Sequence, residues 1–295
     1  MNTCTVEKTA APSRIQRFLR FALVRMLLAI FMTALAGGLT LAYAGKLAHL
    51  RAEVMWPELL AAAAVLLSYG LYVRVFERRP VTELGGNRAV HQLGAGLLIG
   101  AVLVTAVVAL LSAAGGYRVA GSNGLSMAVI TPLAMMIFVG VFEEILSRGI
   151  VFRIAEQSLG SWAALVVSSL LFGLAHLPGE GAGVLAIAVT IVAGVLFAAA
   201  YLLTRKLWLG IGMHIAWNYT LGSIYSIAVS GRDAKGLLRA TVSGPDWLTG
   251  GTYGLEASVF TLIVLAMAAA YLLRKAWTRG HFLQARWRRP VPAGA

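Results

Sequence analysis

The stretch LSMAVITPLAMMIFVGVFEEILSRGIVF, residues 125–152, is apolar over most of its length but contains two adjacent carboxylates, Glu143 and Glu144. About 20 apolar residues are enough for a helix to cross the hydrocarbon core of a bilayer. A charge at the membrane centre costs ~2.5 to 3.5 kcal/mol on insertion scales, so acidic residues in such a helix are rare and usually have a function. The stretch therefore predicts a membrane-spanning helix that carries a functional site.

The rest of the chain has the composition of an integral membrane protein. Of its 295 residues, 59% are hydrophobic and only 13% are charged, and the mean hydropathy is +0.79. Soluble domains are less apolar and more charged. We predict an all-α integral membrane protein, a single bundle of about eight transmembrane helices. The expected spans are residues 26–45, 54–75, 92–115, 125–151, 160–177, 182–204, 207–229 and 254–273.

The positions of the basic residues predict the orientation of this bundle. Lys and Arg collect in short cytoplasmic segments, and here they are frequent in the N-terminal tail, after the second and sixth expected spans, and in the C-terminal tail. We therefore expect basic cytoplasmic tails at 1–25 and 274–295 and a transmembrane bundle at 26–273. The net charge of +13 then reflects topology and contact with membrane lipid. A nucleic-acid partner is not expected, because the charge is scattered over loops.

Other features of the sequence argue against a disulfide framework, a thiolate metal site and a cleavable signal peptide. Cys4 is the only cysteine, so we expect neither a disulfide framework nor a thiolate metal site. Residues 1–20 are polar and basic, which argues against a cleavable signal peptide. The segment 230–253 is rich in Gly, Ser and Thr and is expected to be an external loop, to which we assign no chemistry.

The two carboxylates on the fourth span differ in the partners that helical spacing offers them. Glu144 and Arg148 are four residues apart, which places them on one helix face and predicts an ion pair. Glu143 is rotated by about 100° from Glu144. It must therefore be matched by a group on another helix, and it is the better candidate for a general base.

Candidates for that group lie on the fifth and seventh spans. His176 ends the fifth, and His214 and Asn218 are four apart on the seventh. If a turn at Ser158–Ser161 joins spans four and five into a hairpin, Glu143 and His176 are equally distant from it and can face each other. Each of these residues taken alone is often a packing contact. Together they supply a base, two groups that polarise or donate, and an amide donor.

The motifs Glu143-Glu144-x-x-x-Arg148, Phe172-x-x-x-His176 and His214-x-x-x-Asn218, in this order on successive helices, resemble those of the CPBP intramembrane proteases. That family includes the type II CAAX prenyl endopeptidases and the bacteriocin-processing Abi proteins. The motif-bearing, protease-like core covers residues 125–230. The segment 77–85 also resembles the cytoplasmic lead-in of the family.

The resemblance implies a role for each motif residue. Glu143, with His176, would activate a water that attacks the scissile carbonyl of a membrane-associated or prenylated protein or peptide. His214 and Asn218 would stabilise the oxyanion, a role for which preorganised donors in a dry site are most effective. Three supporting residues would hold and shape the site; they are Glu144, Arg148 and Phe172.

The sequence leaves alternatives open for the cofactor and for the function. Glu143, His176 and His214 could bind Zn²⁺ or another divalent metal with an open position for water. We favour a metal-free site, because the sequence has no His-Glu-x-x-His motif. A proton- or ion-coupled transporter is an alternative, since buried acids and histidines also line ion pathways, and a non-catalytic immunity or scaffold protein is another. The expected location is a bacterial inner membrane.

Overall fold

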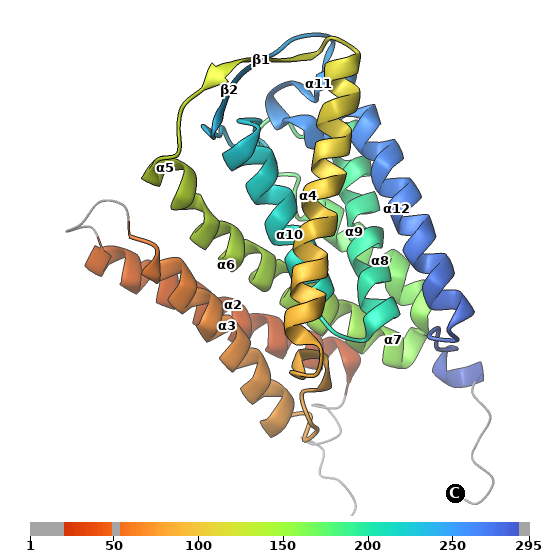
Figure 1. The fold of residues 1–295 in the computed structure, drawn as a ribbon. Coiled ribbons are helices and arrows are strands. Elements are labelled where there is room, and N and C mark those ends of the chain that lie inside the picture. Colours follow the sequence, from red (N-terminus) through yellow and green to blue (C-terminus); the bar gives the residue numbers. More distant parts are fainter. Residues whose placement is uncertain (1–20, 49–53, 289–295) are drawn as a thin grey trace, which may run out of the picture.

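An apolar chain in lipid must satisfy its backbone hydrogen bonds internally, which favours helices, and the computed structural model is mostly helical (Figure 1). It describes residues 21–48 and 54–288. Residues 1–20 of the expected N-terminal tail, Cys4 included, and residues 289–295 of the expected C-terminal tail lie outside the described residues. The longer elements are α2 (Ala22–Ala48), α3 (Trp56–Val75), α4 (Ala89–Ala113), α6 (Pro132–Glu144), α8 (Ser161–Leu174), α9 (Val184–Thr204), α10 (Trp208–Tyr219) and α12 (Val259–Thr278). The shorter ones are η1 (Thr82–Leu84), β1 (Tyr117–Ser122), α5 (Met127–Ile130), α7 (Arg153–Leu159), β2 (Leu238–Val242), α11 (Asp246–Thr249), η4 (Gly251–Tyr253), η5 (Leu255–Ala257) and η6 (Arg286–Arg288).

Within residues 21–48 and 54–288, six helical segments are long and apolar enough to cross a membrane, so the chain is a multi-pass membrane protein. They are Ala22–Ala48, Trp56–Val75, Ala89–Ala113, Met127–Leu159, Val184–Thr204 and Val259–Thr278. The other two expected spans, 160–177 and 207–229, correspond to the shorter helices α8 and α10. The total of eight spans therefore stays a prediction. The boundaries at the tails differ from those expected, because α2 begins at Ala22 and α12 continues to Thr278.

The segment Met127–Leu159 is not one uniform α-helix. After Glu144 the backbone becomes a π-helix, η2 (Ile145–Phe152), before it returns to α-helical form in α7. A second π-helical segment, η3 (Thr220–Ile224), follows α10. Such segments are rare and occur frequently at functional sites. Both π-helices directly follow motif-bearing helices, which nothing in the apolar pattern indicated.

The structure contains a small sheet that the prediction of an all-α chain missed. β1 and β2 pair antiparallel, with Tyr117 opposite Val242 and a bulge between Val119 and Gly121. The strands lie in polar loops that are more than a hundred residues apart in the chain. Their pairing therefore depends on α4 and α12, which bring these loops to the same end of the bundle (Figure 1).

Glycine residues allow α10 to pack unusually close to α4. A Cβ at Gly96 or Gly100 of α4 would lie 2.4 Å from a backbone oxygen of α10, and one at Gly212 of α10 would lie 2.3 Å from the oxygen of Leu93. Small residues at such contacts let helix backbones approach in membrane proteins. Close packing against α4 thus sets the position of α10, which carries two of the motif residues.

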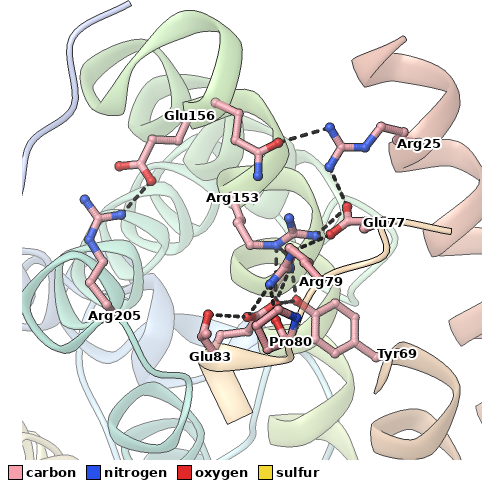
Figure 2. A network of polar contacts seen from close by, with 12 residues as sticks. Arg25, Tyr69, Glu77, Arg79, Pro80, Glu83, Arg153, Glu156 and Arg205 are labelled. Atoms are coloured by element: carbon pink, nitrogen blue, oxygen red, sulfur yellow. Dashed lines mark hydrogen bonds and ion pairs between the residues drawn. The ribbon is translucent and has the colours of Figure 1, made fainter. Parts of the chain in front are cut away.

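A buried polar network, here called the clasp, ties α2, α3 and α7 to the loop that carries η1 (Figure 2). The Glu77 carboxylate accepts from Arg25 at 2.6 Å, from Arg79 at 2.7 Å and from Arg153 at 2.9 Å. Glu83 accepts from Arg79 at 2.7 Å and from the Tyr69 hydroxyl. These residues form the clasp, and both carboxylate side chains are only 2% exposed.

The clasp keeps its carboxylates charged although they are buried. Burial opposes the ionisation of Glu83, but the hydrogen bonds from Arg79 and Tyr69 and the charge of Arg153 outweigh it, so the pKa of Glu83 falls to about 2. A carboxylate that is paired in this way stabilises the fold across the neutral pH range. The lead-in segment 77–85 therefore has a clear structural role.

Basic residues gather at the end of the bundle where the clasp lies, here called the basic end. The loops 76–88, 205–207 and 279–288 meet there, together with the turn between α7 and α8, and it also carries the last turn of α12. Its basic loop residues include Arg78, Arg79, Arg88, Arg205, Lys206, Arg279, Arg286 and Arg288. The opposite end holds the sheet, α11 and the loops 175–183 and 225–258 (Figure 1). The side of the membrane on which each end lies stays a prediction.

We expect Gly96→Ala to destabilise the protein and Gly94→Ala, on the same helix, to leave it unchanged or slightly more stable. The Gly96 substitution forces α4 and α10 apart and should lower the free energy of unfolding by about 1–3 kcal/mol. A Cβ at Gly94 meets nothing within 4 Å, and alanine has the higher helix propensity. Thermal unfolding of both variants in detergent measures the difference, and equal effects would contradict the close packing described here.

Candidate functional site

The motif residues come from α6, η2, α8 with the turn after it, and α10, and most of them line one cavity of about 1250 Å³. Glu143 and Glu144 are the last two residues of α6, and Arg148 lies in η2. Phe172 is on α8, His176 is in the turn that follows it, and His214 and Asn218 are on α10. Five of these seven residues line the cavity, namely Glu143, Phe172, His176, His214 and Asn218. Glu144 and Arg148 are not among its lining residues and are 1% and 0% exposed.

The expected helical hairpin is present and places Glu143 opposite His176. α7 ends at Leu159 and α8 begins at Ser161, with Gly160 between them at a φ of 81°. A positive φ is readily adopted only by glycine. The hairpin turn therefore lies where it was predicted, and the distance between Glu143 Oε2 and His176 Nε2 is 3.8 Å.

A single carboxylate oxygen is the centre of the site. Glu143 Oε2 lies 3.8 Å from His176 Nε2 and 3.7 Å from His214 Nε2. Both distances exceed those of direct hydrogen bonds, and within the described part of the chain this buried oxygen has no hydrogen-bond partner. Buried polar atoms are normally paired. An unpaired oxygen between two imidazoles is therefore suited to hold a small polar ligand such as a water.

The contacts of His176 determine which of its ring nitrogens can accept a proton. His176 Nδ1 lies 2.8 Å from the carbonyl oxygen of Phe172. Because a carbonyl oxygen only accepts, Nδ1 must carry the proton, and Nε2 of the neutral ring is an acceptor. Two acceptors, His176 Nε2 and Glu143 Oε2, thus face each other across 3.8 Å. A water between them can donate to either.

His214 is held from the other side by the buried ion pair. Its Nδ1 lies 3.3 Å from Glu144 Oε1, which also accepts from Arg148 at 2.8 Å. The Nδ1 proton therefore points to Glu144, and Nε2 points toward Glu143. Both ring nitrogens thus face a carboxylate, and the imidazolium form of His214 can donate from Nε2 as well as from Nδ1.

Arg148 is fully buried, and residues of α8 and α9 contact its guanidinium group. It donates to the carbonyl oxygen of Gly194 at 2.8 Å, and its guanidinium carbon lies 4.5 Å from the ring centre of Phe172 and 5.1 Å from that of Phe197. Cation–π contacts of this kind are strongest when they are desolvated. The Phe197 ring also stacks on His214 at 4.8 Å, so Arg148 and His214 are oriented by a shared neighbour.

Sequence reasoning missed Phe197 and Glu256, which shape this site together with Gly210. Phe197 was hidden in a uniformly apolar span and could be found only from its contacts. Gly210 leaves room for Glu144, because a Cβ there would lie 2.9 Å from Glu144 Oε2. Glu256 accepts from Trp217 Nε1 at 2.7 Å and from the backbone nitrogen of Ser230 at 2.6 Å.

Glu256 also fastens the loop to which we had assigned no chemistry. Residues 229–235 line the cavity, and Glu256 holds them next to α10 through Ser230. Gly231 donates to the carbonyl oxygen of Tyr253, which fixes the loop a second time. The loop therefore forms part of the cavity wall.

The donor set does not form a metal site in the arrangement seen here. Among residues 21–48 and 54–288, no group of three or more His, Cys, Asp or Glu side chains is placed to hold a metal ion. This includes Glu143, His176 and His214, the three ligands named from the sequence. We therefore derive no chemical step that passes through a metal.

A comparison with protein-family models identifies the domain that carries this site. Residues 125–220 match the model described as "Type II CAAX prenyl endopeptidase Rce1-like", and the match includes all three motifs. The comparisons with curated proteins and with solved structures found no match. The chain thus contains an Rce1-like type II CAAX prenyl endopeptidase family domain, as the resemblance indicated. Similarity to this domain indicates an intramembrane protease.

We expect Arg148→Met to be strongly destabilising, because it leaves the buried Glu144 carboxylate without its charge partner. Removing one member of a buried ion pair typically costs about 3–5 kcal/mol. The double variant Glu144→Gln with Arg148→Met removes both charges and should recover part of that loss. Thermal unfolding in detergent tests both expectations. Wild-type stability in Arg148→Met would show that the pair does not support the fold.

Proposed function

We propose that the chain is an intramembrane endopeptidase that hydrolyses a peptide bond with a water activated by Glu143 and His176. The observation that carries this proposal is the unpaired Glu143 Oε2 between two imidazole nitrogens in a cavity. The family match supports the reaction class. We also propose that the protein lies in a bacterial inner membrane, with eight spans and both termini in the cytoplasm.

In the first step, a water held between Glu143 Oε2 and His176 Nε2 attacks the scissile carbonyl carbon. Glu143 takes one proton from the water as the new carbon–oxygen bond forms, and the carbonyl oxygen becomes an oxyanion. A positioned general base contributes typically 10²–10⁴-fold to such a step. The Glu143 proton then moves to the leaving amine as the carbon–nitrogen bond breaks, which restores the carboxylate.

The oxyanion needs donors, and α10 supplies two candidates. His214 as the imidazolium donates from Nε2, which faces the same space as Glu143. Asn218 is one helical turn further along α10 and lines the same cavity. Its side-chain amide can donate a second hydrogen bond. Glu144 and Arg148 act as positioning residues, because they hold the His214 ring from behind.

The walls of the cavity favour an apolar or membrane-embedded substrate segment. The α6 side is lined by Met135, Phe138, Val139, Phe142 and Leu146. An extended peptide that enters from the lipid phase would bury its apolar side chains against this wall. A membrane-associated protein or peptide, prenylated or not, fits this surface, and a nucleic acid does not.

The two alternative functions have less support. A transporter needs a route to both sides of the membrane, but none of the cavity's lining residues comes from the basic-end loops 76–88, 205–207 or 279–288. A scaffold protein would have no need for a carboxylate oxygen that lies between two imidazole nitrogens in a cavity. The endopeptidase accounts for both observations.

We expect Glu143→Gln and Asn218→Ala to reduce cleavage to different extents. Glu143→Gln removes the base and should abolish cleavage, whereas the loss of one oxyanion donor typically lowers kcat by about 10²–10³-fold. The readout is the set of new protein termini in membranes of expressing cells. Glu58→Gln, in the first turn of α3 and not among the residues that line the cavity, is the control that should keep wild-type activity. Cleavage by a folded Glu143→Gln variant at the wild-type rate would refute the mechanism.

Activity should survive thorough removal of divalent metals. The purified protein is treated with a chelator, its metal content is measured, and cleavage of a substrate found in the termini experiment is compared with that of the untreated protein. We expect equal rates, because the proposed water is activated by Glu143 and His176 alone. Loss of activity that Zn²⁺ restores would instead assign Glu143, His176 and His214 as metal ligands.

A further inference from the structure

The loop 229–235, which lines the cavity, lies between two parts of the candidate site. On one side it packs against the turn after α8, which carries His176. A Cβ at Gly179 of this turn would lie 2.9 Å from the carbonyl oxygen of Ser230, and the Gly179 nitrogen donates to the carbonyl oxygen of His176 at 3.1 Å. A Cβ at Gly231 would lie 2.3 Å from another backbone oxygen of the turn. The position of the loop and that of the His176 turn are therefore fixed together.

On its other side the loop is joined to α10 by a carboxylate. Glu256 lies in η5, just before α12, and lines the cavity. Its Oε2 accepts from the backbone nitrogen of Ser230 at 2.6 Å and from the Ser230 hydroxyl at 2.9 Å. Its Oε1 accepts from Nε1 of Trp217 at 2.7 Å. Trp217 is buried and directly precedes Asn218 on α10. One oxygen of Glu256 thus holds the loop, and the other holds the helix that carries His214 and Asn218.

The chemistry of these contacts requires a carboxylate. Trp217 Nε1 and the Ser230 backbone nitrogen can only donate, so both oxygens that face them must accept. An amide in place of the carboxylate would turn its N–H groups toward one of the two donors and leave that donor unpaired. Hydrogen bonds to an ionised acceptor are also roughly twice as strong as those between neutral groups. A glutamate is therefore suited to hold the loop and α10 at once, and a glutamine is not.

We propose that Glu256 is a positioning residue, which fixes the His176 turn and Asn218 relative to each other. The inference rests on the proposed function and adds to it a residue that lies outside the three motifs and outside the matched residues 125–220. The carrying observation is that one Glu256 oxygen holds the loop that packs on the His176 turn, while the other holds the residue before Asn218.

This role predicts which step of the reaction depends on Glu256. In the proposed mechanism His176 acts on the water and Asn218 on the oxyanion, so an error in their relative position raises the barrier of the chemical step. The apolar side chains of the substrate are expected on the α6 wall, which the loop and α10 do not form. Loss of the Glu256 contacts should therefore slow the chemistry more than it weakens substrate binding.

We expect Glu256→Gln to lower kcat by about tenfold and to change KM by less than about threefold. The substrate is a peptide that spans a Glu143-dependent cleavage site from the termini experiment, and rates are measured on purified protein in detergent, per mole of folded protein. Asp246→Asn makes the same chemical change at an exposed carboxylate of α11 that does not line the cavity, and it should keep both constants. An unchanged kcat in Glu256→Gln, or a change in KM alone, would overturn the proposal.

A double-variant cycle separates positioning from a general loss of structure. If Glu256 acts through Asn218, then Glu256→Gln should cost less kcat in an Asn218→Ala background than in wild type, because the donor that it positions is already gone. A residue that only stabilises the fold has no reason to show this coupling once rates are expressed per mole of folded protein. Equal losses of kcat in the two backgrounds would contradict the positioning role.

Limited proteolysis tests the hold on the loop without any need for catalytic activity. The loop contains two exposed trypsin sites, Arg232 and Lys235. In detergent, trypsin should cut Glu256→Gln at these sites about tenfold faster than wild type, because local opening of the loop becomes easier, and cutting after the exposed Arg279 should not change. Equal cutting of the loop in both proteins would overturn the proposal. Absence of any Glu143-dependent cleavage would refute the proposed function instead, and the trypsin result would still decide whether Glu256 holds the loop.

Discussion

The buried ion pair between Glu144 and Arg148 is the interaction on which the rest of the site depends. Both groups are almost completely buried, so each requires the other's charge. Arg148 also donates to Gly194 of α9, and Glu144 reaches His214 of α10. One ion pair thus joins three helices and orients an imidazole. Because it satisfies Glu144, the neighbouring Glu143 is the carboxylate left to face the cavity.

The helices around this pair are positioned by contacts of a different kind. Glycine residues bring α10 against α4, and a glycine opposite Glu144 leaves space for its carboxylate. The clasp ties the basic-end loop 76–88 to α2 and α7, whereas the opposite end is built from loops and a small sheet. The result is a cavity with apolar walls, one polar centre and charged residues of the loop 229–235 in its lining. The proposed hydrolysis needs such a space, in which a peptide segment can approach one buried carboxylate oxygen.

Local patterns predicted a large part of this architecture. The i, i+4 spacing of Glu144 and Arg148 predicted their ion pair, and counting residues from the Ser158–Ser161 turn predicted that Glu143 and His176 face each other. The π-helix after Glu144 was not predicted, because a change of helical hydrogen bonding has no signature in apolar composition. Phe197 and Glu256 were missed because their roles come from neighbours on other elements. The pairing of β1 with β2 was missed for the same reason.

The sequence by itself determined that this is a helical, multi-pass membrane protein, which motif residues are available, and that basic residues are concentrated in certain loops. These features follow from the length, the apolarity and the residue spacing of single segments. The thickness of the membrane and the period of the α-helix relate such local properties directly to structure. Only the tertiary structure decided that two imidazoles converge on one unpaired oxygen, that a distant loop lines the cavity, and that the cavity opens at the end opposite the arginines. Those features depend on packing between residues far apart in the chain, where a shift of one helix by a few ångströms changes the contacts without changing any local pattern.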